Sequence, residues 1–197
     1  ETQADYRSRT GRPVPMVQWR IVDTDMNDIP HDGKSQGELV LRAPWLTQGY
    51  LKDEDNSKEL WRGGWMHTGD LAVMDADGYA NIVGRIKDMV IRGGENIYPK
   101  EIEEFLYTHP AIEEVQVTGI PDEKYGEELI AWVKLNSTAG EITGEDLREY
   151  CKGKITHFKI PRYFKFVDEF PMTVTGKIQK FKMREISIKE LGLEDQK

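Results

Sequence analysis

The fold of this chain is decided by the stretch Gly84-Arg85-Ile86-Lys87-Asp88-Met89-Val90-Ile91-Arg92-Gly93-Gly94-Glu95-Asn96-Ile97-Tyr98-Pro99. Its apolar run at 89–91 is closed by the pair Gly93-Gly94, a pattern that predicts a short strand ending in a tight turn. Two adjacent glycines permit positive φ and leave backbone N–H groups free to point at an anion. Pro99 suits the first position of a helix. An ordinary strand–turn–helix corner has the same pattern, so a structural role and a binding role both stay open here.

The composition is that of a globular chain with an acidic balance. Its 197 residues suffice for one medium domain or two small ones, and a charged fraction of 31% with a hydrophobic fraction of 38% is typical of folded proteins. The net charge of −8 argues against nonspecific binding to nucleic acid or to an anionic membrane. The single cysteine, Cys151, excludes an internal disulfide and a thiolate metal cluster. It indicates a reducing compartment, and we expect the cytoplasm. No apolar run approaches the length of a transmembrane helix.

The first part of the chain, residues 1–87, is predicted to be a small antiparallel β unit. After a polar loop up to about residue 12, β-rich segments at 16–23 and 37–42 predict two strands, and residues 50–60 suit one short helix. The segments 71–74 and 79–83 flank Asp75-Ala76-Asp77-Gly78 and predict a hairpin. The two aspartates resemble the start of a calcium loop. Because the remaining ligands and the closing Glu are missing, we predict a turn.

The second part, residues 88–197, is predicted to be a compact α+β domain. The helix that begins at Pro99 has one apolar face, made of Ile102, Phe105 and Leu106. Strands are expected at 115–120, 129–135 and 162–167, and a last helix at 181–191. Thr143 and Asp146 match a capping box. The helix that follows is expected to bury Leu147, Tyr150 and Cys151, which makes Cys151 a core residue and not a nucleophile.

Two polar constellations in the first part could carry chemistry. Thr68-Gly69-Asp70 precedes the strand expected at 71–74 and offers a hydroxyl and a carboxylate that can accept from two hydroxyls at once, as on a ribose. A turn in which the aspartate caps its own backbone fits the same residues. Arg85 follows the strand expected at 79–83, where its guanidinium suits a ribose or a phosphate. A surface ion pair with Asp88 or a nearby acid is the alternative.

Two more constellations lie in the second part. The first is a basic segment, Lys152-Gly153-Lys154 with His157-Phe158-Lys159-Ile160-Pro161-Arg162. In an acidic protein such a segment is the place to dock a phosphorylated ligand, although solvated charges framing a strand have the same pattern. The second is the loop Pro171-Met172-Thr173-Val174-Thr175-Gly176-Lys177, whose lysine can reach a phosphate or a carboxylate as a mobile point charge. Its glycine spacing differs from that of the phosphate loop of nucleotide hydrolases.

Taken in order, these segments resemble the C-terminal third of the superfamily of acyl-CoA synthetases, peptide-synthetase adenylation domains and luciferases. The resemblance covers nearly the whole chain from Gly11 onward. The matching segments are Gly37-Glu38-Leu39 with Gly49-Tyr50, Thr68-Gly69-Asp70, Gly84-Arg85-Ile86-Lys87-Asp88, Gly93-Gly94-Glu95-Asn96-Ile97-Tyr98-Pro99 and Pro171 through Thr175-Gly176-Lys177. The segments 93–99 and 152–161 are most similar to the fatty and medium-chain acyl-CoA ligase branch.

The resemblance implies a fold and a reaction. Residues 1–87 would be a distorted β-barrel-like subdomain that ends a large N-terminal domain, and residues 88–197 a mobile α+β lid domain. The reaction would be a two-step ligation, in which a carboxylate attacks the α-phosphate of ATP to give an acyl-adenylate and pyrophosphate. The thiol of coenzyme A then displaces AMP. ATP, AMP, coenzyme A and Mg²⁺ are therefore the expected cofactors.

The resemblance also assigns roles to individual residues. Asp70, with Thr68 beside it, would bind the ribose hydroxyls, and Arg85 the ribose or phosphate region. Lys177 would bridge the reacting carboxylate and the α-phosphate. Lys87 matches the hinge, where the family often has Asp and sometimes Lys. The residues matched to coenzyme A binding are Gly93, Gly94 and Glu95 along the pantetheine tunnel and Phe158 and Lys159 near the nucleotide.

The departures from the family concern residues upstream. The family's phosphate loop, Thr-Glu metal motif and acyl pocket have no counterpart in this sequence. Glu1-Thr2 resembles the metal motif but lies too close to Gly11-Arg12-Pro13 to be that motif. We therefore expect the Mg²⁺ ligands upstream, no metal site in this chain, and no turnover by the chain as an isolated fragment. An adenylation domain that loads a carrier protein and a non-catalytic interaction module are the alternatives.

The expected partners are small molecules. They are a carboxylic acid, ATP and coenzyme A. We expect no nucleic-acid partner and no transmembrane segment. For the full-length enzyme, a homodimer is the expected assembly. Asp70 and Arg85 must lie on the same side of the first part if they share one nucleotide. Opposite sides would remove the basis of the ligase assignment.

Overall fold

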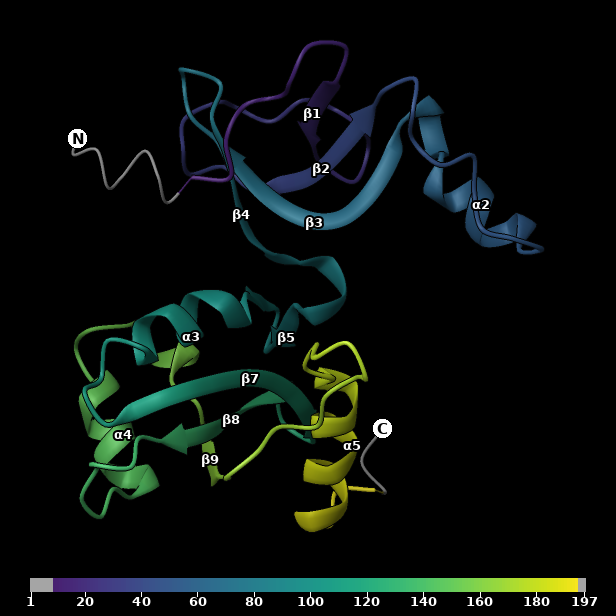
Figure 1. Ribbon diagram of the computed structural model, residues 1–197. Helices are drawn as coiled ribbons and strands as arrows, with labels where there is room; N and C mark the ends of the chain where they lie inside the picture. Colours follow the sequence, from purple (N-terminus) through teal and green to yellow (C-terminus); the bar gives the residue numbers. More distant parts are fainter. Residues whose placement is uncertain (1–8, 195–197) are drawn as a thin grey trace. The chain divides into compact units, whose positions relative to one another are not determined.

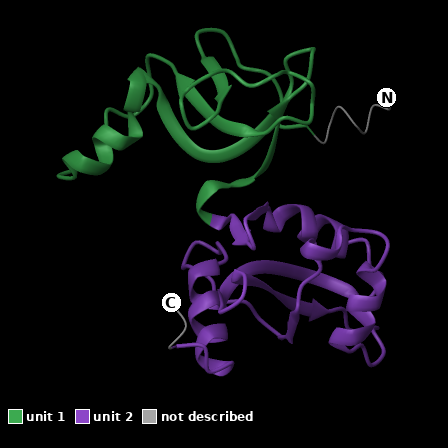
Figure 2. Cartoon of the chain, turned by 180° about the vertical axis from the view of Figure 1, so that it is seen from behind, with its two compact units in different colours: residues 1–87 green, residues 88–197 purple. Residues whose placement is uncertain are grey.

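The computed structural model describes residues 9–194, which form two compact units. The first unit ends at Lys87 and the second begins at Asp88 (Figure 2). The loop expected up to about residue 12 lies largely outside the described residues. Each of the three buried apolar clusters belongs to one unit, so each unit has a core of its own.

The first unit is a four-stranded antiparallel sheet in chain order. Its strands are β1 (Gln18–Val22), β2 (Gly37–Arg42), β3 (Met66–Met74) and β4 (Ala80–Arg85). Figure 1 shows β3 as a strongly curved strand. The buried side chains of its core are Ile21, Leu39, Ala72, Met74 and Ala80. The short helix α2 (Glu54–Leu60) buries no residue and is capped by Asp53, which accepts from the N–H of Asn56. A 3-10 turn, η1 (Arg62–Gly64), leads into β3.

The hairpin between β3 and β4 is confirmed, and its aspartate serves the turn. Asp75 Oδ1 accepts from the N–H groups of Asp77 and Tyr79 at 3.0 Å and 2.9 Å. Gly78, at φ +78°, completes the turn with its N–H bonded to the Asp75 carbonyl. A carboxylate used in this way stabilises the turn locally, as expected for an Asx turn.

The second unit is built on a five-stranded mixed sheet. The strands β5 (Val90–Arg92), β6 (Glu95–Ile97), β7 (Ile112–Asp122), β8 (Gly126–Leu135) and β9 (Tyr163–Phe166) are arranged in the order β6-β5-β8-β7, with β9 parallel to β8. The strand β6 was not predicted, because the glycine turn was expected to lead directly into a helix. The reason is that a three-residue strand with polar Glu95 and Asn96 carries no period of its own, and only Ile97 is buried.

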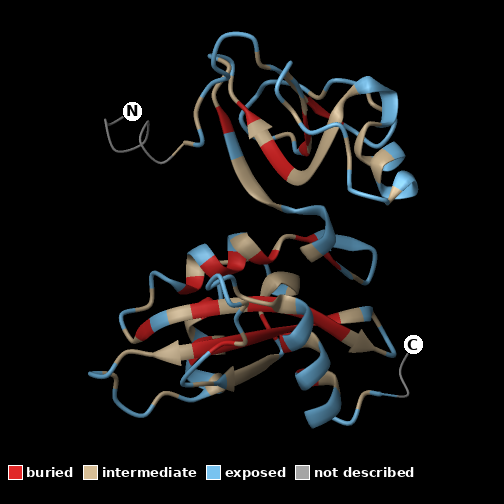
Figure 3. Cartoon of the chain, turned by 45° about the vertical axis from the view of Figure 1, so that its right-hand side comes forward, coloured by how far each residue is buried: buried red, intermediate tan, exposed pale blue. Residues whose placement is uncertain are grey.

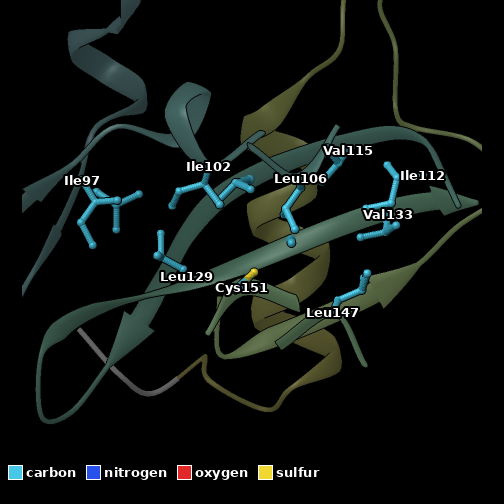
Figure 4. Close-up of a cluster of buried hydrophobic side chains, with 12 residues drawn as sticks. Ile97, Ile102, Leu106, Ile112, Val115, Leu129, Val133, Leu147 and Cys151 are labelled. Carbon is cyan, nitrogen blue, oxygen red and sulfur yellow. The ribbon is translucent and has the colours of Figure 1, made fainter. Parts of the chain in front are cut away.

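Helices cover both faces of this sheet. They are α3 (Pro99–Leu106), α4 (Gly144–Cys151) and α5 (Lys180–Glu190), with a 3-10 turn η3 (His157–Lys159) between α4 and β9. A second 3-10 turn, η2 (Ile86–Asp88), lies at the joint. The predicted proline start of α3 and the capping box of Thr143 and Asp146 are both present. The larger core lies under α3 and α4 (Figure 4). Figure 3 shows buried residues along β7 and β8.

Cys151 lies in this larger core and is confirmed as a structural residue. Its side chain is fully buried, and burial raises the pKa of the thiol to about 11. Because the thiolate is the reactive form, we expect the native chain to react with an aromatic disulfide reagent at pH 8 about a hundredfold more slowly than the urea-unfolded chain. The native rate should go on rising above pH 9, where the unfolded thiol is already largely ionised. The absorbance of the released thiolate measures both rates. Equal rates in the two states would contradict a buried thiol.

Candidate functional site

Residues 68–70 form a bulge inside β3. They were predicted to lie in a turn before a strand, and this was wrong, because β3 already begins at Met66. In the pairing with β2, Glu38 is opposite Leu71 and Val40 is opposite His67, so three residues of β3 face a single residue of β2. A bulge interrupts the ladder and re-aims the side chains on it.

Hydrogen bonds within the first unit hold this bulge. The Thr68 hydroxyl donates to the Leu39 carbonyl at 2.7 Å and accepts from the N–H of Asp70 at 3.0 Å. Gly69 has φ +72°, and its N–H donates to Glu38 Oε1 at 3.0 Å. The Thr68 hydroxyl is therefore occupied by the bulge, and Thr68 is placed to orient Asp70.

His67 and Glu38 contact each other next to the bulge. His67 Nδ1 lies 2.8 Å from Glu38 Oε2, and His67 Nε2 lies 3.2 Å from the Arg62 carbonyl. Their side chains are 10% and 14% exposed. Neither residue was assigned a role from the sequence. No local pattern signals this pair, because the two residues are 29 positions apart and meet only through the β2–β3 register.

Asp70 and Arg85 face each other across β3 and β4, so their expected placement on one side is confirmed. They are register partners, and Arg85 Nε donates to Asp70 Oδ1 at 3.0 Å. Asp70 is one third exposed and Arg85 two thirds. Such an exposed pair contributes at most about 1 kcal/mol, so a ligand can compete for both groups. Among the described residues no hydrogen bond is made to Asp70 Oδ2.

The glycine pair connects β5 to β6 in a left-handed turn. Gly93 and Gly94 have φ of +59° and +87°, and the Gly93 N–H donates to the Tyr125 carbonyl at 2.8 Å. A Cβ on Gly93 would lie 3.2 Å from the Tyr125 ring, whereas a Cβ on Gly94 would meet nothing within 4 Å. The Gly94 side of the turn is therefore open. Glu95 follows as an exposed residue of β6.

Three cations of the basic segment are paired with neighbouring acids, and a fourth lies over an aromatic ring. The interactions are Lys159 with Glu101 at 2.7 Å, Arg162 with Asp122 at 3.1 Å, Lys152 with Glu149, and Lys154 over the Tyr150 ring at 3.6 Å. This favours paired surface charges over a bare cationic cluster. Phe158 packs against the larger core, and its carbonyl accepts from Arg92 Nη1 at 3.3 Å. This hydrogen bond connects the segment of Phe158 to Arg92, the residue before Gly93, although the two segments are far apart in the sequence.

Lys177 is exposed at the end of a tight turn that its neighbours fix. The Thr173 N–H donates to the Lys177 carbonyl at 2.8 Å, and the Thr173 hydroxyl accepts from the Lys177 N–H at 3.0 Å. Gly176, at φ +79°, closes the turn. Within residues 9–194 the Lys177 side chain makes no ion pair. Its ammonium is therefore available to an anionic ligand, while its backbone is held.

The described residues give two further observations. None of their helices has both the length and the apolar character needed to cross a bilayer. Nor do three His, Cys, Asp or Glu side chains gather anywhere in residues 9–194 as they would around a metal ion.

The two glycines of the β5–β6 turn provide a matched test of this geometry. Alanine at Gly94 should cost about 1–2 kcal/mol of unfolding free energy, from left-handed backbone strain alone. Alanine at Gly93 should cost about 1 kcal/mol more, because its methyl group also presses on the Tyr125 ring. Urea unfolding of both variants measures the difference. A Gly93→Ala chain as stable as Gly94→Ala would contradict the tight contact.

Comparison with known proteins identifies the family. A family described as "AMP-binding enzyme C-terminal domain" matches residues 101–177. The chain is 52% identical over 185 residues to "Putative acyl-CoA synthetase YngI" of Bacillus subtilis, covering 93% of this chain and 33% of that protein. It is 48% identical over 180 residues to "Medium-chain acyl-CoA ligase ACSF2, mitochondrial" of Danio rerio, covering 91% and 29%.

Solved structures agree with these matches. ATP-bound MatB from Rhodopseudomonas palustris superposes with a TM-score of 0.85 at 33% identity, over 93% of this chain and 36% of that one. The chain spans about a third of the length of the curated relatives it matches. The expected α+β fold is confirmed. Residues 101–177 therefore belong to the AMP-binding enzyme C-terminal domain family, and the chain corresponds to the C-terminal part of adenylate-forming enzymes.

Proposed function

We propose that this chain supplies the C-terminal part of an ATP-dependent acyl-CoA ligase. A carboxylate oxygen attacks the α-phosphorus of ATP, and pyrophosphate leaves. The sulfur of coenzyme A then attacks the acyl carbon, loses its proton, and displaces AMP. The observation that carries the proposal is the exposed Asp70–Arg85 pair, in which Asp70 lies on a bulge fixed by Thr68 and Glu38. The names of the curated relatives, acyl-CoA synthetase and medium-chain acyl-CoA ligase, support the same reaction and a fatty carboxylic acid as substrate.

In the proposed adenylation step, Asp70 and Arg85 hold the nucleotide. The carboxylate of Asp70 has acceptor capacity for both ribose hydroxyls, and Oδ2 makes no other hydrogen bond among the described residues. Arg85 presents further donors of its fork to the ribose or phosphate. The bulge keeps the Asp70 backbone in place, so the ligand meets a pre-oriented carboxylate.

Lys177 is the proposed catalytic residue of the same step. Its ammonium would bridge the substrate carboxylate and the α-phosphate, where negative charge gathers as the new bond forms. Electrostatic stabilisation of this kind is usually the largest single contribution in phosphoryl-type transfers. The hydrogen bonds of the Thr173 turn hold its backbone, so less freedom is lost when the ligand binds. Mg²⁺ is expected to enter with the ATP phosphates.

The thioester-forming step is assigned to other residues of the second unit. The turn of Gly93 and Gly94 has an open side, along which the pantetheine chain would approach the backbone. Glu95, the next residue, would lie beside the same chain. Phe158 and Lys159 would lie near the coenzyme nucleotide. Lys159 would have to exchange Glu101 for a phosphate, because the two side chains are now paired.

Compartment and assembly stay predictions. The cytoplasm is the compartment we expect from the cysteine content, and several vertebrate relatives are named as mitochondrial proteins. A homodimer of the full-length enzyme likewise stays a prediction.

The reaction can be tested by exchanging the matched third of Danio rerio ACSF2 for this chain. With a medium-chain carboxylic acid, ATP, Mg²⁺ and coenzyme A, the exchange protein should release pyrophosphate and form acyl-CoA. ACSF2 without that third is the negative control. A cooperatively folded exchange protein that releases no pyrophosphate would overturn the proposal. Thioester formation only with a phosphopantetheinylated carrier protein would favour the carrier-loading alternative.

In this exchange protein, Lys177→Ala should abolish adenylate formation, with a loss of about a hundredfold or more. It should leave thioester formation from supplied acyl-adenylate nearly unchanged, because the lysine acts on the phosphate. Pyrophosphate release and acyl-CoA formation are measured separately. Lys189→Ala, which removes another exposed lysine of the second unit, is the control and should affect neither step. Equal loss of both half-reactions would refute the role of Lys177.

Lys87→Pro tests the proposed hinge. Lys87 is exposed and ends the first unit, within η2. Proline locks φ, so the second half-reaction should slow more than the first. Lys87→Ala, which keeps φ free, should change neither rate by more than about twofold. If the proline variant forms thioester at the normal rate, the hinge lies elsewhere.

A further inference from the structure

A buried ion pair in the second unit involves two residues that the proposed function does not use. Glu128, on β8, has no exposed surface, and the side chain of Arg92, at the end of β5, is 12% exposed. Arg92 Nη2 donates to Glu128 Oε2 at 2.8 Å. Arg92 Nε lies 2.7 Å from Oε1 without making a hydrogen bond, and Oε1 accepts from the Leu129 N–H at 2.8 Å. One charge-assisted hydrogen bond and a second close ionic contact hold the guanidinium beside the buried carboxylate.

The remaining nitrogen of this guanidinium reaches a third segment. Arg92 Nη1 donates to the Phe158 carbonyl of η3 at 3.3 Å. The guanidinium also lies over the Tyr125 ring, 4.7 Å from its centroid, and the Tyr125 carbonyl accepts from the Gly93 N–H at 2.8 Å. One side chain therefore connects the β5–β6 turn, the β7–β8 turn and η3.

Backbone pairing between β5 and β8 is short. Their register has a single pair, Arg92 opposite Gly126, whereas β7 and β8 pair along nearly their whole lengths. Two hydrogen bonds add to it, from the Gly93 N–H to Tyr125 and from the Ile91 N–H to Glu127 Oε2 at 2.9 Å. With so short a ladder, side-chain contacts must decide where the β5–β6 hairpin lies. Val90 and Ile97 contribute apolar packing in the larger core, and the Arg92–Glu128 pair contributes a buried polar contact.

Burial makes this pair a poor source of net stability. Removing two ions from water offsets most of their mutual attraction, and apolar residues of similar volume often stabilise such a site equally well. Apolar residues, however, make no directional contact with the Phe158 carbonyl. What the ion pair adds over an apolar replacement is therefore geometry, namely a fixed spacing between the Gly93-Gly94 turn and η3.

We propose that Arg92 and Glu128 are positioning residues for thioester formation. They hold the Gly93-Gly94 turn and the Phe158–Lys159 segment at the spacing that one coenzyme A molecule needs, with its pantetheine at the turn and its nucleotide at η3. This inference rests on the proposed function. Adenylate formation does not depend on the pair, because the segment after Lys177 is anchored elsewhere, through Lys180 Nζ and Glu103 Oε1 at 2.7 Å.

The test uses the exchange protein with both charges removed, R92M/E128M, so that no orphan ion is buried and folding is preserved. Arg92→Lys keeps the positive charge and loses the fork. In both variants, kcat/KM for coenzyme A with supplied acyl-adenylate should fall about ten- to a hundredfold, while adenylate formation stays within about twofold. Lys134→Met, which breaks the exposed Lys134–Glu113 pair at 2.6 Å on the same sheet, is the matched control and should change neither step.

Amide hydrogen exchange in the 197-residue chain gives a readout that needs no activity. In R92M/E128M, exchange should be faster at 93–97 and 157–160, with the β7–β8 ladder still protected. Unchanged kcat/KM for coenzyme A in an active exchange protein would overturn this inference alone. Equal loss of both half-reactions, with faster exchange throughout the unit, would also overturn it, because the pair would then be only structural. An inactive wild-type exchange protein would overturn the proposed function and this inference with it.

Discussion

The second unit depends on β8, a strand with both faces buried. Leu129, Ala131 and Val133 face the core under α3 and α4, while Ile130 and Trp132 face the core under α5. Strict alternation in a strand is what lets one backbone serve two cores. β8 also pairs with β7, β9 and the end of β5, so the segments proposed to bind coenzyme A are tied to it. A shift of one residue in its register would exchange the two cores and detach these segments.

The residues assigned to function are placed by irregular backbone that regular structure supports. Asp70 lies on a bulge, Gly93 in a left-handed turn, and Lys177 at the end of a turn closed by Gly176. Gly69, Gly93 and Gly176 take the left-handed φ in these segments without the steric cost that other residues would have. Hydrogen bonds from neighbouring residues hold the backbone of Asp70 and Lys177 in place before a ligand arrives.

Ion pairs within the chain determine which Lys and Arg side chains are available to an anionic ligand. In the basic segment, acids of the same unit neutralise Lys159, Arg162 and Lys152. Lys177 makes no ion pair within the described residues, and Arg85 keeps most of its surface. The basic segment at 152–162 was interpreted from the sequence as a docking place for a phosphorylated ligand or as solvated charges framing a strand. Its ion pairs favour the second interpretation.

Local sequence determined most of the elements and the motif positions. The capping box at Thr143, the proline start of α3, the β3–β4 hairpin and the buried Cys151 all follow from interactions within a few residues, so short-range patterns sufficed. Tertiary structure alone decided the bulge at 68–70, the strand β6, and which charges meet. Glu38 with His67 and Arg92 with Glu128 are 29 and 36 residues apart. Such partners are brought together by strand register, and no local pattern encodes register across an intervening chain of that length.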